Sequence, residues 1–138
     1  MKPVLLFLLC IALFSKGLVA QEKNEDKEPA TIKNPPVKYG VASFYAKKFN
    51  QRRTASGEIY NPNKFTAACN VLPLGSWIKV TNLRNQRFVI VKTNDRLHPK
   101  NKRLVDLSWV AAKHLGYVSR GLTRVKVEVL KNYRPARK

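Results

Sequence analysis

The sequence predicts a mainly β fold, a small barrel of short strands with one brief helix. Residues 77–81 (WIKVT) and 123–130 (TRVKVEVL) alternate in the two-residue period of a strand with one buried face. Only one stretch, residues 109–115 (WVAAKHL), has clear helical character. Short strands with so little helix favour a barrel over a layered α/β sheet.

The predicted elements can be placed in order along the chain. Ser108 before the helical stretch is a good N-cap, and Gly116 after it suits a helix end. The link NLRNQR between the second and third strand segments is short enough to predict a hairpin. The predicted strands cover residues 39–45, 77–81, 88–92, 103–107 and 123–130.

Three segments outside this domain have their own composition. Residues 1–20 carry an apolar core too short to span a membrane, which predicts a signal peptide cleaved near Ala20 and an exported product. The residues before Cys10 do not suit a lipoprotein signal, so lipid anchoring is not expected. The polar, proline-bearing stretch 21–37 predicts a disordered linker, and 132–138 a basic tail after a domain at 38–131.

The charge of the chain limits the binding partners that we expect. The chain has 27 Lys and Arg against 8 Asp and Glu, and from residue 38 onward 22 basic side chains face 4 acidic ones. Such a surface favours anionic polymers or membrane surfaces. Export makes nucleic acid an unexpected partner, which leaves the cell wall and peripheral contact with the envelope. Once the signal peptide is removed, Cys69 has no cysteine partner, and we expect a monomer.

Four carboxylates remain as candidate acids in the domain. Asp95 follows the apolar strand FVIVK where it runs into a loop, a common place for functional groups. Asp106 precedes the helix and suits either a turn-stabilising or a site role, whereas Glu58 and Glu128 suit surface positions. His98 lies three residues after Asp95 and could reach the same cleft. The sequence contains no metal-ligand cluster and no phosphate loop, so neither a metal nor a cofactor is expected.

These residues carry a resemblance to a known family. The segments ASFYA, RRTASGE, TAA, LPLG, VTNL, NDR and DLS follow one another between residues 39 and 130. In this order they resemble the rare lipoprotein A (RlpA) family of lytic transglycosylases, whose domain is a six-stranded double-psi β-barrel. Expansins, which share that barrel, resemble the chain more weakly, mainly around DLS.

The resemblance implies cleavage of the bond between N-acetylmuramic acid (MurNAc) and N-acetylglucosamine (GlcNAc) in peptidoglycan, on glycan strands without stem peptides. The C6 hydroxyl of MurNAc attacks instead of water and leaves a 1,6-anhydro sugar, so a single acid/base suffices, unlike in most glycosidases. Asp95 matches the catalytic aspartate of the family. The resemblance and the surrounding motifs suggest substrate-binding or cleft roles for Tyr45, Thr54, Ser56, Glu58, Asn94, Arg96 and Asp106.

Two positions depart from the family pattern. Cys69 stands where the family has a histidine, and we expect it in the cleft opposite Asp95, although a thiol is a poor substitute for imidazole. Where the family reads NDRGP, this chain has Leu97 and His98 before the proline, so His98 could replace the missing histidine.

Three hypotheses therefore stay open. The first is an active lytic transglycosylase that uses Asp95. The second is a catalytically weak or inactive module that binds wall glycan through its Lys and Arg surface. The third is a basic exported protein whose charge serves only adhesion to the envelope.

Overall fold

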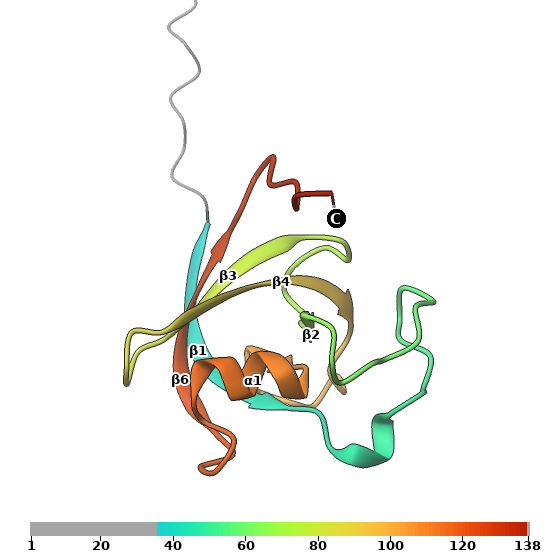
Figure 1. The fold of residues 1–138 in the computed structure, drawn as a ribbon, viewed down its shortest axis with the longest axis horizontal. Helices are drawn as coiled ribbons and strands as arrows, with labels where there is room; N and C mark the ends of the chain where they lie inside the picture. Colours follow the sequence, from blue (N-terminus) through green and yellow to red (C-terminus); the bar gives the residue numbers. More distant parts are fainter. Residues whose placement is uncertain (1–35, 138) are drawn as a thin grey trace, which may run out of the picture. The chain divides into compact units, whose positions relative to one another are not determined.

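The computed structural model describes residues 36–137, and Figure 1 gives their ribbon. The predicted signal peptide and nearly all of the predicted linker lie outside the described residues. Strand β1 begins at Val37, one residue before the predicted start of the domain. None of the helices between residues 36 and 137 has both the length and the apolar character that a membrane crossing requires.

The described residues form six strands, a short 3-10 helix and an α-helix. In chain order these elements are β1 (Val37–Phe44), η1 (Lys47–Phe49), β2 (Thr66–Ala68), β3 (Trp77–Asn82), β4 (Phe88–Asp95), β5 (Val105–Leu107), α1 (Trp109–Leu115) and β6 (Thr123–Val129).

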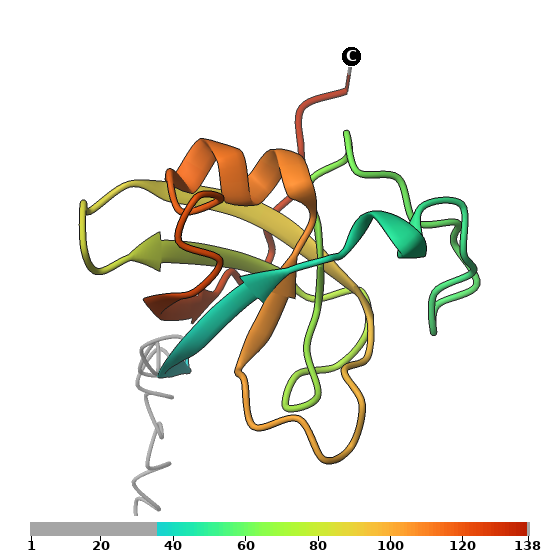
Figure 2. The ribbon, with the colours of Figure 1, turned by 90° about the horizontal axis from the view of Figure 1, so that it is seen from below.

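The six strands close into a barrel in the order β1-β5-β2-β4-β3-β6 (Figures 1 and 2). The pairs β1/β5 and β2/β4 are parallel, and the other neighbours are antiparallel. The predicted mainly β barrel is confirmed, and β3 and β4 form the predicted hairpin. Segments 45–65 and 96–104 each join strands that are not neighbours, so each passes the strand that lies between them.

The barrel core follows the predicted alternation. Inward side chains of β3, β4 and β6 are at most 6% exposed: Ile78, Val80, Val89, Val91, Val125 and Val127. Full burial of one such side chain stabilises the fold by about 1.5–3 kcal/mol. Helix α1 adds Ala111, Ala112 and Leu115 to the same core.

The ends of α1 show one prediction confirmed and one only partly met. Gly116 adopts a left-handed conformation with φ of 78°, and its N–H donates to the carbonyls of Ala112 and Lys113, so it ends the helix as predicted. Ser108 is the N-cap, but its side chain makes no capping hydrogen bond. Its hydroxyl instead lies 3.5 Å from the N–H of Thr66, at the start of β2.

Several strands differ from the sequence prediction: β1 begins two residues earlier, and β4 runs three residues further, so Asp95 ends that strand rather than lying in the loop. β2 was not predicted, because three buried residues (TAA) show no alternation between polar and apolar side chains. β5 begins at Val105 rather than at residue 103, since Arg103 belongs to the preceding turn and its N–H donates to the Asn101 side chain. Tyr133 of the predicted basic tail packs on Trp77, with ring centroids 5.2 Å apart.

Candidate active site

A cavity of about 430 Å³ opens at the carboxyl end of β4, and we call it the Asp95 cavity. Its walls come from the end of β1, from η1, from the end of β2, from the loop after β4 and from β5. Five predicted site residues line it together: Tyr45, Asp95, Arg96, His98 and Asp106. A larger hollow of about 800 Å³, lined by Arg87, Lys113 and His114 among others, has no carboxylate in its lining.

Asp95 is the last residue of β4, and its carboxylate is held by three donors. The N–H groups of Ala55 and Arg96 donate to Oδ1 at 2.9 and 2.8 Å, and the Tyr45 hydroxyl donates to Oδ2 at 2.6 Å. None of these donors is a charged group. The side chain is half-buried, so the carboxylate is fixed in direction while it still borders the cavity.

Tyr45 is fixed by stacking as well as by its hydrogen bond. Its ring stacks on that of Tyr60, with centroids 4.2 Å apart and an angle of 16° between the planes. Burial, and then the hydrogen bond to Asp95, raises the pKa of Tyr45 far above its usual range. The hydroxyl therefore stays protonated and remains a donor to Asp95. Sequence reasoning identified Tyr45 but missed Tyr60, which is 2% exposed.

Asp106 borders the same cavity with a different partner. The Arg103 guanidinium donates from Nε to Oδ1 at 2.8 Å and from an Nη atom to Oδ2 at 2.9 Å, which is a bidentate ion pair. Hydrogen bonding to Asp106 raises the pKa of Arg103. Asp106 lies in β5 and caps no helix in this structure.

The Cys69 side chain lies in the core and not along the Asp95 cavity. It is 0% exposed and belongs to the buried hydrophobic cluster, which corrects the expectation that the thiol faces Asp95 across the cleft. The residues around Cys69 contact the cavity lining through backbone groups and through the Asn70 side chain, whose Oδ1 accepts the Leu97 N–H at 2.8 Å. The Cys69 N–H donates to the Asp95 carbonyl at 3.0 Å, and the Arg96 guanidinium donates to the carbonyls of Cys69 and Leu72.

His98 is exposed and lines the Asp95 cavity in the loop after β4. Its Nδ1 accepts the N–H of Lys100 at 3.2 Å. A neutral imidazole that accepts at Nδ1 carries its proton on Nε2. His98 therefore offers an Nε2–H donor at this cavity, where Cys69 offers none.

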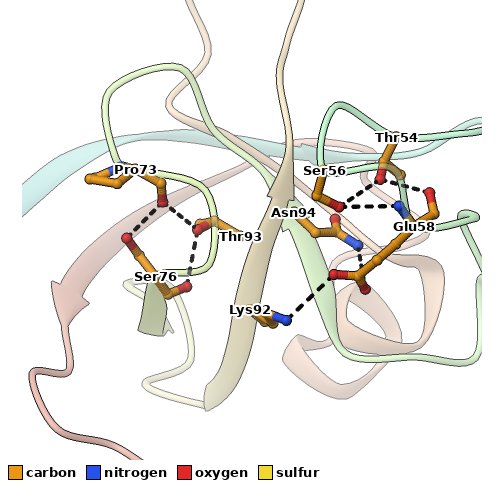
Figure 3. A network of polar contacts seen from close by, with 8 residues as sticks. All are labelled: Thr54, Ser56, Glu58, Pro73, Ser76, Lys92, Thr93 and Asn94. Carbon is orange, nitrogen blue, oxygen red and sulfur yellow. Dashed lines mark hydrogen bonds and ion pairs between the residues drawn. The ribbon is translucent and has the colours of Figure 1, made fainter.

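A polar network supports the Asp95 cavity without lining it (Figure 3). Its members are four predicted substrate-binding residues: Thr54, Ser56, Glu58 and Asn94. The Thr54 hydroxyl donates to the Glu58 carbonyl at 2.7 Å and lies 3.1 Å from the Ser56 hydroxyl. The Ser56 N–H donates to the Asn94 carbonyl at 3.0 Å. This network orders the turn around Ala55, whose N–H reaches Asp95. Alanine carries no side-chain signal, so the sequence could not single it out.

Glu58 has charged and polar neighbours of its own. Its carboxylate lies 3.4 Å from Lys92 Nζ and 3.5 Å from Asn94 Nδ2 (Figure 3). These partners account for Glu58 as a surface carboxylate outside the cavity lining. Within residues 36–137, His, Cys, Asp and Glu side chains nowhere gather in threes, so this range holds no ligand cluster for a metal ion.

The barrel topology has clear counterparts among solved structures. The Streptomyces papain inhibitor matches with a TM-score of 0.59 at 17% identity, over 72% of this chain and 98% of that one. A point mutant of Clavibacter michiganensis expansin in complex with cellohexaose matches with a TM-score of 0.57 at 17% identity, over 73% and 54%. At these identities the likeness establishes the fold alone.

With a closed six-strand barrel, two parallel pairs and a carboxylate-lined cavity, the chain is a double-psi β-barrel domain of the RlpA-like kind. The sequence profile of the family described as lytic transglycolase matches residues 37–127, and the chain belongs to this family.

Relatives of known name agree with this assignment. The endolytic peptidoglycan transglycosylase RlpA of Pasteurella multocida is 53% identical over 98 residues, covering 71% of this chain and 33% of the relative. The protein of the same name from Haemophilus influenzae is 52% identical over 94 residues, covering 68% and 33%. The chain thus spans about a third of the length of these relatives, and the predicted family resemblance is confirmed.

Proposed function

We propose that the protein is an endolytic lytic transglycosylase that cleaves the MurNAc–GlcNAc bond of peptidoglycan and leaves 1,6-anhydro-MurNAc ends. The observation that carries the proposal is the Asp95 carboxylate, fixed by three uncharged donors at the border of a cavity. The relatives are named endolytic peptidoglycan transglycosylases, and these names supply the proposed substrate. Strands without stem peptides are the proposed form of that substrate.

The hydrogen bonds of Asp95 assign different tasks to its two oxygens. Oδ1 already accepts two backbone N–H groups, so the transferable proton belongs on Oδ2. Asp95 gives this proton to the glycosidic oxygen as the bond from C1 of MurNAc breaks, and GlcNAc leaves with a hydroxyl at C4. The C6 hydroxyl of MurNAc then bonds to C1, and its proton returns to Oδ2. No water is consumed.

His98 is the proposed substitute for the family histidine. Its Nε2–H can donate to a sugar oxygen in the Asp95 cavity, which the buried Cys69 thiol cannot do. Arg96 lines the same cavity and holds the Cys69 segment through two backbone carbonyls. In this proposal Thr54, Ser56, Glu58 and Asn94 position the Ala55 turn rather than touch the glycan.

The proposed location is the cell envelope, where peptidoglycan lies. Between residues 38 and 138 the chain carries 22 basic side chains against 4 acidic ones, which favours peripheral association with anionic envelope surfaces. Export, cleavage near Ala20 without lipid anchoring, and a monomeric state belong to the same proposal.

A digestion of purified glycan strands stripped of stem peptides tests the proposed activity. The wild-type protein should release fragments with anhydro ends, lighter by one water than hydrolysis products, and Asp95→Asn should abolish them. Glu128→Gln is the matched control, because Glu128 pairs with Lys126 at 3.1 Å and does not line the Asp95 cavity. Absence of anhydro ends with the wild type, together with salt-sensitive sedimentation on peptidoglycan, would favour the inactive binding module instead.

A further inference from the structure

A second, smaller pocket of about 180 Å³ shares Tyr45 with the Asp95 cavity, and we call it the Trp109 pocket. Its lining consists of aromatic, amide and basic side chains with one proline: Tyr45, Lys47, Asn50, Tyr60, Pro62, Asn63 and Trp109. Tyr45 lines both hollows, so the Trp109 pocket lies next to the Asp95 cavity.

The size and walls of the Trp109 pocket suit one sugar unit. Its volume is below the roughly 300 Å³ at which pockets for drug-sized ligands begin, so a single ring fits better than a disaccharide. Trp109 is 37% exposed, and its backbone N–H donates to the Tyr60 hydroxyl at 3.3 Å. Lys113 Nζ lies over the Trp109 ring at 5.0 Å from its centroid, and the indole surface left exposed suits the apolar C–H face of a pyranose. The amides of Asn50 and Asn63 suit its hydroxyl and acetamido groups.

Lys47 gives the Trp109 pocket a positive charge with no carboxylate in the lining to offset it. The sugar that complements such a pocket is N-acetylated and anionic. MurNAc meets this description only when its lactyl group ends in a free carboxylate. A stem peptide converts that carboxylate into a neutral amide, so Lys47 can distinguish stripped units from peptide-bearing ones.

We infer that the Trp109 pocket binds a MurNAc unit of the glycan strand near the cleaved bond, with Trp109 against the ring and Lys47 paired with the free lactyl carboxylate. The inference deepens the proposed function and rests on it for the identity of the glycan. The pocket then determines specificity, whereas the chemistry belongs to the Asp95 cavity.

Two forms of the same strands test the role of Lys47. One form carries free lactyl carboxylates after amidase treatment, and in the other these carboxylates are converted to methylamides. Wild type should bind and cleave the first form about threefold better, the scale of one exposed ion pair. Lys47→Gln should lose this preference. Lys48→Gln should keep it, because Lys48 is the next residue, lies over the Phe49 ring and does not line the pocket. An unchanged preference in Lys47→Gln overturns the inference.

Variants at Trp109 test the ring contact. Trp109→Ala should lower strand affinity about fivefold, and Trp109→Tyr should retain most of it. Tyr39→Ala, which removes an aromatic ring that is 63% exposed on β1 and outside the pocket lining, should leave affinity unchanged. Equal losses at Tyr39 and Trp109, or none at Trp109, contradict the proposed contact. Binding of the two strand forms does not depend on cleavage. Absence of anhydro products would therefore reject the proposed activity, while the difference in affinity between the two forms would still test the pocket.

Discussion

Asp95 and Asp106 border the same cavity, but their surroundings differ in kind. Asp95 accepts hydrogen bonds from two backbone N–H groups and a tyrosine hydroxyl. Asp106 is held on both oxygens by the guanidinium of Arg103. Both oxygens of Asp106 are thus taken up by one guanidinium, whereas Oδ2 of Asp95 accepts only the Tyr45 hydroxyl. In the proposed function Asp95 exchanges the proton, and Asp106 holds the cavity wall.

The largest expected effect is the loss of activity in Asp95→Asn. An amide at this position can neither give nor take the proton, so kcat on stripped strands should fall about 10²- to 10⁴-fold. The measurement is the initial rate of anhydro-end formation by mass spectrometry, with Glu128→Gln as control. If Asp95→Asn keeps a rate within threefold of wild type, Asp95 is not the acid/base, and its proposed difference in role from Asp106 no longer holds.

The next effect tests the direction in which Asp95 is held. Tyr45→Phe removes the donor to Oδ2 but keeps the ring that stacks on Tyr60. One hydrogen bond to a charged group contributes about 1.5–3 kcal/mol, so kcat should fall at least tenfold.

Tyr117→Phe is the matched control for Tyr45→Phe. The Tyr117 hydroxyl donates to the Ser43 carbonyl at 2.7 Å, and burial raises its pKa as it does for Tyr45. Tyr117 does not line the Asp95 cavity, so this variant should lower the melting temperature and spare kcat. Equal kcat losses in both variants would indicate a general structural effect.

A smaller effect, on stability, is expected from Asp106→Asn. The change breaks the pair with Arg103, whose side chain is 37% exposed, and should lower the free energy of unfolding by about 1 kcal/mol. Arg103→Gln should lower the free energy of unfolding by a similar amount. The double variant should lose less than the sum of the two single losses, because the two side chains interact. Urea denaturation measures all three. A loss of activity as large as that of Asp95→Asn would instead make Asp106 a second acid.

The sequence predicted what depends on local pattern. Alternation located β3 and β6, the apolar run FVIVK located β4, and the end of that run pointed to Asp95 at the cavity. The sequence could not predict the groups that hold the two aspartates. The Ala55 N–H reaches Asp95 from a turn, and Arg103 reaches Asp106 through an ion pair, and only the folded chain brings these groups together.

The position of the Cys69 side chain was also beyond the sequence. The pairing of β2 with β4 shifts register between Ala67 and Ala68, one residue before Cys69. A shift of one residue exchanges the two faces of a strand, so an irregularity at this point prevents the family motif alone from assigning a side chain to the cavity or to the core.

The smallest expected effect on kcat comes from this buried thiol, together with a stability loss similar to that of Asp106→Asn. Cys69→Ala leaves the backbone bonds to Asp95 and Arg96 in place and removes one sulfur atom from the core. Unfolding free energy should fall by about 1 kcal/mol, near the low end of large-to-small core changes, while kcat stays within twofold of wild type. Thermal denaturation and the strand digestion measure the two quantities. A large drop in kcat without loss of stability would mean that the thiol reaches the substrate, and the contrast between a catalytic Asp95 and a structural Cys69 would no longer hold.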